Sequence, residues 1–120
     1  MTAVRVDDAV LAAVLSALAG PRKGDRVAAV GVAPMVVRSL LAASQTDELV
    51  EEDARVVVAG AAHDVPTALL RLAAGGRIVA VAADAGAAGR VAAAAGLQMY
   101  SVQRIGGGVA WSARRPEAGD

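Results

Sequence analysis

The sequence offers few side chains that could do chemistry. His63 is its only histidine; it stands beside Asp64, shortly after an apolar run that ends at Gly60. Open α/β sheets bind ligands beyond the carboxyl ends of their strands, so a histidine at this place could act as a general base. The simpler interpretation is that Asp64 caps a helix beginning near Pro66, with His63 in the exposed loop before it. His63 is thus the one catalytic candidate, and the sequence alone does not assign it a role.

Other reactive groups are missing or have simpler explanations. The chain has no cysteine, which removes disulfides, thiolate catalysis and cysteine-bound metals. The acidic segment from Asp47 to Asp53 lacks the ordered spacing of calcium loops, so we interpret it as a solvated face and expect no metal. Gly106-Gly107-Gly108 precedes a strand pattern and not a helix, which predicts a hairpin turn and not a phosphate cradle.

Charge and hydropathy limit the partners. Twelve basic residues balance twelve acidic ones, giving a formal net charge of zero. This argues against a nucleic-acid binder, and the pair Arg114-Arg115 is too short a basic patch to indicate a polyanion partner. No apolar run approaches the roughly 20 residues that span a bilayer, and the first residues lack the order of a signal peptide. We therefore expect a cytoplasmic protein that binds neither nucleic acid nor membrane.

The segment from Asp53 to Asp84 predicts the centre of the fold. Val56-Val57-Val58-Ala59 and Ile78-Val79-Ala80-Val81 are unbroken apolar runs, as in strands of a parallel sheet covered on both faces. Between them, Pro66 suits a first helical turn, and Gly75-Gly76 suits a helix end. The residues at helical spacing in between are Leu69, Leu70, Leu72 and Ala73. Strand, helix and strand in this order predict a βαβ unit.

The flanking segments extend this unit into one α/β domain. An N-terminal helix, capped by Asp7 or Asp8, should end at Gly20-Pro21, and Asp84 should cap the helix that Gly96 terminates. The remaining expected elements are a strand over 26–30, a helix from about Pro34 to Ser44, a loop with one helical turn over 45–53, and a hairpin over 97–104 and 109–113. We expect a single domain over 1–114, with three α/β/α layers and about five strands, and a disordered tail over 115–120.

The order of these elements resembles the class I S-adenosylmethionine-dependent methyltransferases. Lys23-Gly24-Asp25-Arg26-Val27, before a strand ending in Gly31, is similar to the family's first-strand entry. The segment 72–79 is similar to the fifth-strand entry, and Gly96-Leu97 to the start of the sixth. The resemblance implies a Rossmann-like sheet, mostly parallel with a C-terminal antiparallel hairpin. If S-adenosylmethionine is bound, the resemblance places Gly31, Ala33, Gly60 and Ala61 around this cofactor and His63 near the methyl acceptor.

Two departures put methyl transfer in doubt. The acidic position of the family's first strand is Ala29 here, and the Gly-x-Gly turn has become Gly31-Val32-Ala33-Pro34, with a proline that lacks an amide donor. Between Gly31 and Arg55 there is no room for the second and third strands, so the carboxylate that holds the ribose hydroxyls is missing as well. Glu48, Glu51 or Glu52 could replace it only if the acidic segment folds back over the first strand.

The loss of two strands turns the first strand into a sheet edge. Val27, Ala28, Ala29 and Val30 carry no charge, and such an edge invites pairing unless the acidic segment, a second copy or another protein covers it. We therefore expect a non-catalytic, methyltransferase-like interaction or regulatory module, self-associating as a homodimer and with no cofactor. The alternative is a S-adenosylmethionine-dependent methyltransferase, or a subunit of one that a partner chain completes. A third hypothesis keeps the sheet but binds another small ligand at the strand ends.

Overall fold

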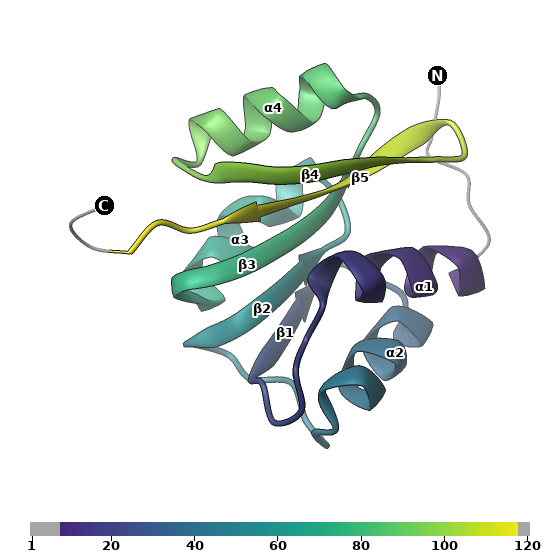
Figure 1. Ribbon diagram of the computed structural model, residues 1–120, viewed down its shortest axis with the longest axis vertical. Coiled ribbons are helices and arrows are strands. Elements are labelled where there is room, and N and C mark those ends of the chain that lie inside the picture. Colours follow the sequence, from purple (N-terminus) through teal and green to yellow (C-terminus); the bar gives the residue numbers. More distant parts are fainter. Residues whose placement is uncertain (1–7, 118–120) are drawn as a thin grey trace.

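The computed structural model describes residues 8–117 and consists of a five-stranded sheet between helices (Figure 1). The strands follow the order β1-β2-β3-β5-β4 across the sheet. The elements are α1 (Asp8–Ala19), β1 (Val27–Val30), α2 (Pro34–Ser44), β2 (Ala54–Ala59), a 3-10 turn (Ala62–Asp64), α3 (Val65–Arg71), β3 (Leu72–Ala82), α4 (Ala85–Ala94), β4 (Gln98–Ile105) and β5 (Gly108–Arg114).

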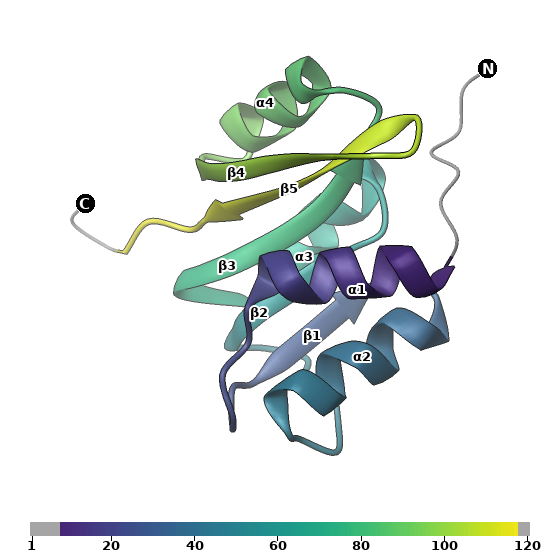
Figure 2. The ribbon, with the colours of Figure 1, turned by 45° about the vertical axis from the view of Figure 1, so that its right-hand side comes forward.

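The helices form a layer on each face of the sheet. One core packs α1 and α2 against the sheet through residues such as Leu15, Leu40 and Val58. The other packs α3 and α4 against the opposite face and includes Trp111, which is almost fully buried. Figure 2 shows α1 and α2 next to each other over β1 to β3, with α4 beside β4. The expected three-layer α/β/α arrangement is confirmed.

The sheet is parallel on one side and antiparallel on the other. β1 pairs with β2 and β2 with β3 in parallel, which fits their continuous apolar sequences because both faces are buried. β5 pairs antiparallel with β3 and with β4, so the C-terminal strands form the expected hairpin. The fold class is therefore a Rossmann-like α/β sheet of five strands. No helix among residues 8–117 is long and apolar enough to cross a membrane.

The boundary between α3 and β3 differs from the prediction. The helix ends at Arg71, and Leu72 and Ala73 already belong to the strand, where Leu72 pairs with Ala54 of β2. Gly75, expected to end the helix, instead lies in the strand with a positive φ of 76°. Its N–H donates to the Arg115 carbonyl at 2.8 Å. Pairing with distant chain segments has thus overridden local helical spacing. Residues 118–120 of the expected tail lie outside the described part of the chain.

The predicted helix caps have mixed outcomes. Asp84 caps α4 as expected, since its Oδ1 accepts a hydrogen bond from the Ala87 N–H at 2.7 Å. Asp64 occupies the N-cap position of α3, but its side chain makes no capping hydrogen bond, so that prediction is wrong. The expected cap by Asp7 or Asp8 lies outside the part of the chain whose side chains are described.

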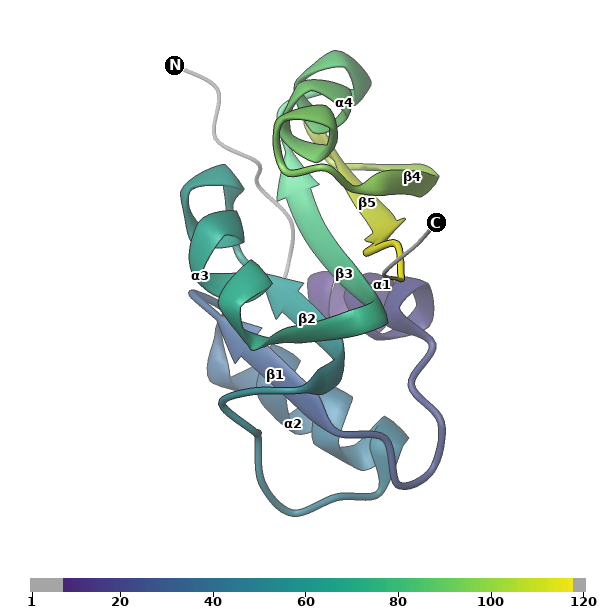
Figure 3. The same cartoon turned by 90° about the vertical axis from the view of Figure 1, so that its left-hand side faces the viewer.

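β1 is an edge of the sheet, and the acidic segment runs beside it (Figure 3). The segment has no helical turn, contrary to expectation. Leu49 packs on the core of α1 and α2 and Val50 on the core of α3 and α4, so the chain passes around the edge between them. The Val50 N–H donates to the Val27 carbonyl at 2.8 Å. The acidic segment, a second copy of the chain and another protein are the three possible covers for this edge. Of these, the acidic segment lies along the edge within the chain itself.

Candidate functional site

The residues expected around the cofactor do come together at the carboxyl ends of β1 and β2. The Gly60 N–H donates to the Val30 carbonyl at 2.9 Å, which sets the turn after β2 against the turn after β1. Gly31 has a φ of 68°, a left-handed conformation that suits glycine. Ala33 and Ala61 follow in extended conformations that open α2 and the 3-10 turn. These four residues therefore lie at the same end of the parallel strands, and their role around a cofactor stays a prediction.

At this edge the residues contact one another directly. A Cβ placed on Gly60 would clash with the carbonyl oxygen of Gly31. A Cβ placed on Gly31 would clash with the carboxylate of Asp64, lying 2.6 Å from its Cγ and 2.8 Å from its Oδ1. The Asp64 carboxylate thus covers Gly31, and the Gly31 turn rests on Gly60. In this arrangement the protein's own atoms occupy the space beside both glycines.

His63 lies beside this contact and is exposed to solvent. Its side chain is 85% exposed, whereas that of Asp64 is 15% exposed, and Nε2 of His63 lies 3.5 Å from Oδ1 of Asp64. The exposed position predicted for His63 is confirmed. Its proposed general-base role gains no support from burial, because the imidazole faces solvent.

The acidic segment lies at the wrong end of the sheet to hold a ribose. Val50 is hydrogen-bonded to Val27, the first residue of β1, and the Glu52 carbonyl accepts from the Arg26 guanidinium at 3.1 Å. Gly31 follows the last residue of the same strand, four residues and about 13 Å beyond Val27 at roughly 3.3 Å per residue. Glu48, Glu51 and Glu52 therefore flank the amino end of β1. With Ala29 in the acidic position, the described residues do not fit a ribose-binding site for S-adenosylmethionine.

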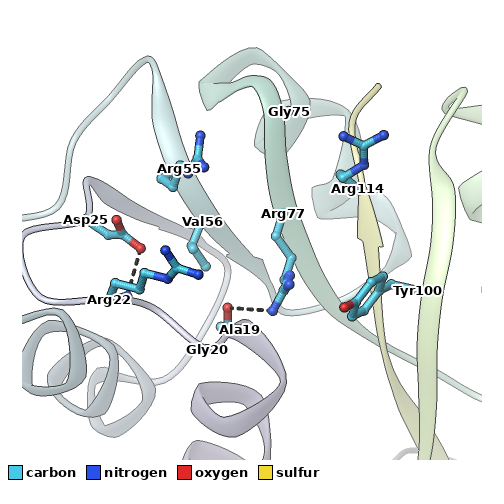
Figure 4. Close-up of a pocket in the computed structure, with 10 residues that line it drawn as sticks. All are labelled: Ala19, Gly20, Arg22, Asp25, Arg55, Val56, Gly75, Arg77, Tyr100 and Arg114. Atoms are coloured by element: carbon cyan, nitrogen blue, oxygen red, sulfur yellow. Dashed lines mark hydrogen bonds between the residues drawn. The ribbon is translucent and has the colours of Figure 1, made fainter. Parts of the chain in front are cut away.

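Two cavities lie away from the Gly31–Gly60 contact. One, of about 380 Å³, lies between the start of α4 and the β4–β5 turn and includes Arg104 and Asp84. The other, of about 400 Å³, lies at the amino ends of the parallel strands (Figure 4). Its walls carry four arginines, Arg22, Arg55, Arg77 and Arg114, and we call it the arginine pocket. Among residues 8–117 no cluster of histidine and carboxylate side chains could hold a metal.

The sequence interpretation missed the arginine pocket because its residues are far apart along the chain. A signal was nevertheless present. Arg55 and Arg77 each stand directly before an apolar strand run, and Arg114 ends the last strand, β5, which runs the opposite way. Residues at the start of parallel strands and a residue at the end of an antiparallel strand lie at the same end of the sheet.

Comparison with solved structures identifies the fold. A SAM-dependent O-methyltransferase from Thermotoga maritima superposes with a TM-score of 0.63 over 99% of this chain and 69% of that one, at 11% identity. The ribosomal protein L11 methylase of Lactobacillus delbrueckii subsp. bulgaricus gives 0.60 over 89% and 77%, at 13% identity. A complex of the Haloferax volcanii Trm112 methyltransferase activator with a methyltransferase gives 0.59 over 96% and 100%, at 12% identity.

The chain thus has the fold of the class I SAM-dependent methyltransferases, in a shortened form. No protein-family model matches the sequence. No curated protein matches it either. Sequence identities of 11–13% show a shared fold and nothing more, so the function has to be argued from the residues of the site.

Proposed function

We propose that this chain is a methyltransferase-like domain that does not transfer methyl groups and acts as a protein-interaction or regulatory module. The contact between Gly31, Gly60 and the Asp64 carboxylate carries this proposal. These glycines are the places where the fold family brings backbone close to its cofactor. Here one glycine faces the other, and a carboxylate covers Gly31. A cofactor could enter only after this end of the sheet had opened.

The missing ribose carboxylate supports the same proposal. Ala29 cannot accept a hydrogen bond through its side chain, and the acidic segment is held at the opposite end of β1 by the bond from Val50 to Val27. Burying ribose hydroxyls without a hydrogen-bond acceptor is unfavourable. The residues that the structure describes therefore provide neither the space nor the polar partner for the nucleoside at this end of the sheet.

We place the interaction at the outer edge of β1 and expect it to join two copies of the chain. The carbonyls of Arg26 and Val30 accept from the β2 side, so the backbone groups of Val27 and Ala29 point outward. The Val27 carbonyl is engaged by Val50, and the Ala29 carbonyl accepts only a long bond of 3.4 Å from the Arg71 guanidinium. The outward N–H groups of Val27 and Ala29 could donate hydrogen bonds to the carbonyls of a partner strand. The buried side chain of Ala28 takes no part.

Thermal unfolding with S-adenosylmethionine and with S-adenosylhomocysteine tests the loss of methyl transfer. A ligand at a hundred times its dissociation constant stabilises by about 2.7 kcal/mol. For this chain that corresponds to a rise in Tm of about 10 °C, from a specific unfolding entropy of about 2.1 cal/mol/K per residue. We expect no rise at millimolar ligand. Sedimentation velocity over a hundredfold range of protein concentration tests self-association; a monomer throughout would exclude the proposed homodimer.

A second function, methyl transfer by a subunit that a partner chain completes, is favoured by one observation. The Haloferax volcanii neighbour was solved together with a methyltransferase activator. On this alternative a partner would draw Asp64 away from Gly31 and open the site to a cofactor lined by Gly31, Ala33, Gly60 and Ala61, with His63 near the acceptor. The variant Asp64→Ala mimics that release. If it binds S-adenosylhomocysteine while the wild type does not, the partner-completed enzyme becomes the better proposal.

A further inference from the structure

The arginine pocket collects positive charge from four separate elements. Arg22 comes from the loop after α1, Arg55 from β2, Arg77 from β3 and Arg114 from the end of β5 (Figure 4). Two carboxylates lie close by. Asp25 lines the pocket and its Oδ2 accepts from the backbone N–H of Arg22 at 2.8 Å, and Glu117 rests against the wall at Gly75. Among residues 8–117, four arginines against these two carboxylates leave the pocket positive, in a chain whose formal net charge is zero.

The geometry of the sheet places two of these cations directly opposite each other. Arg77 of β3 and Arg114 of β5 are register partners in the antiparallel pair. Like charges at such positions repel and destabilise a sheet. Arg55 of β2 also lines the pocket, one residue before Val56, which is the register partner of Arg77. The gathering of four arginines around one cavity points to a negatively charged ligand.

Arg77 is held in place by the end of α1 and by Tyr100. Its Nη1 donates to the carbonyls of Leu18 and Ala19 at the end of α1, each at 3.3 Å. Its guanidinium lies over the ring of Tyr100, 4.8 Å from the centroid. The approach to α1 is close: a Cβ on Gly20 would lie 3.2 Å from Arg77 Nη1. Such positioning reduces the entropy lost when a ligand binds.

From these observations we propose that the arginine pocket binds a small phosphorylated molecule, with a diphosphate group as its best-fitting anion. Guanidinium groups bind phosphate oxygens in bidentate pairs, and the two phosphates of a diphosphate can bind different arginines of the pocket. The volume of about 400 Å³ lies within the range of small-molecule sites. The balanced net charge and the confined pocket favour a small ligand over a nucleic acid. This site is at the opposite end of the strands from Gly31 and is independent of the function proposed above.

Calorimetric titration of the full chain with inorganic pyrophosphate and with orthophosphate at low ionic strength tests the proposal. Pyrophosphate should bind more tightly than orthophosphate, and added salt should weaken both. The test variant is Arg22→Gln/Arg55→Gln. Both side chains are exposed, and neither guanidinium makes a hydrogen bond within residues 8–117, so the fold does not depend on hydrogen bonds from them. The matched control is Arg38→Gln/Arg90→Gln, which removes the same charge from exposed positions on α2 and α4.

We expect the test variant to bind pyrophosphate at least about tenfold more weakly, the loss of one charge-assisted hydrogen bond or more, and the control to stay within about twofold. The proposal is overturned if wild type does not bind pyrophosphate, or if both variants lose the same affinity. It is also overturned if a single-stranded oligonucleotide displaces pyrophosphate and binds more tightly. Should the double variant fail to fold by circular dichroism, Arg55→Gln alone is compared with Arg38→Gln.

Discussion

Replacing Gly60 by alanine adds one methyl group at the point where the turns after β1 and β2 meet. That methyl group would overlap the carbonyl oxygen of Gly31, a backbone atom that cannot rotate away. The φ of Gly60 is not in the left-handed region, so backbone strain does not contribute. The effect of Gly60→Ala therefore reports how tightly this end of the sheet is closed.

The size of the effect follows from overpacking. Forcing an extra methyl group into a packed site costs typically about 1–3 kcal/mol. An unfolding entropy of about 2.1 cal/mol/K per residue over 120 residues makes each kcal/mol worth about 4 °C. Gly60→Ala should therefore lower Tm by about 4–12 °C, measured by calorimetry or circular dichroism.

Gly89→Ala is the matched control, because it makes the same chemical change in the middle of α4. No heavy atom lies within 4 Å of a Cβ placed there. Alanine is more stable than glycine in a helix by about 0.5–1 kcal/mol, so Tm should rise by about 2–4 °C. The reasoning is refuted if Gly60→Ala melts within about 2 °C of the wild type, since the two turns would then separate easily. A similar fall in the Tm of Gly89→Ala would also refute the reasoning.

Three further predictions concern a cap, a buried hydroxyl pair and the sheet edge. Asp84→Ala should lower the unfolding free energy by about 0.5–2 kcal/mol in denaturant titrations, since it removes the cap of α4, whereas Asp64→Ala should cost less because its side chain makes no capping bond. An equal loss in both would contradict this assignment. Ser112→Ala should cost about 1 kcal/mol because it leaves the Ser101 hydroxyl, now 2.6 Å from that of Ser112, without its partner, and Ser101→Ala/Ser112→Ala should recover part of the loss. Additive losses would exclude the pair. Val50→Pro removes the N–H that covers the Val27 carbonyl and should increase self-association in sedimentation runs; unchanged association would place any interface elsewhere.

The centre of the fold could be predicted because its signals are local. The apolar runs over 56–59 and 78–81 are long enough to identify buried parallel strands, and the structure buries nearly all of their side chains. Pro34 and the residues before Gln45 bound α2 as expected. The C-terminal hairpin follows from the glycines at 106–108. Each of these features depends on neighbours a few residues apart.

Contacts between distant residues could not be predicted in this way. Leu72 continues a helical pattern in the sequence, but it pairs with Ala54 and therefore belongs to β3 and not to α3. Asp64 was expected to cap its own helix, yet its carboxylate lies on Gly31 from another turn. The sequence thus predicted that Gly31 and Gly60 follow neighbouring strands, but it did not reveal that they contact each other. The pairing of Arg77 with Arg114 likewise depends on strand register, which no local motif records.

A calorimetric titration of the chain with S-adenosylhomocysteine tests the central claim most directly, because it measures whether the end of the sheet at Gly31 and Gly60 admits the cofactor product. Our account predicts no heat of binding at millimolar ligand for the wild-type chain alone. Saturable binding, lost in Gly60→Ala and retained in the control Gly89→Ala, would contradict it and would show that the closed contact opens to a functional cofactor site.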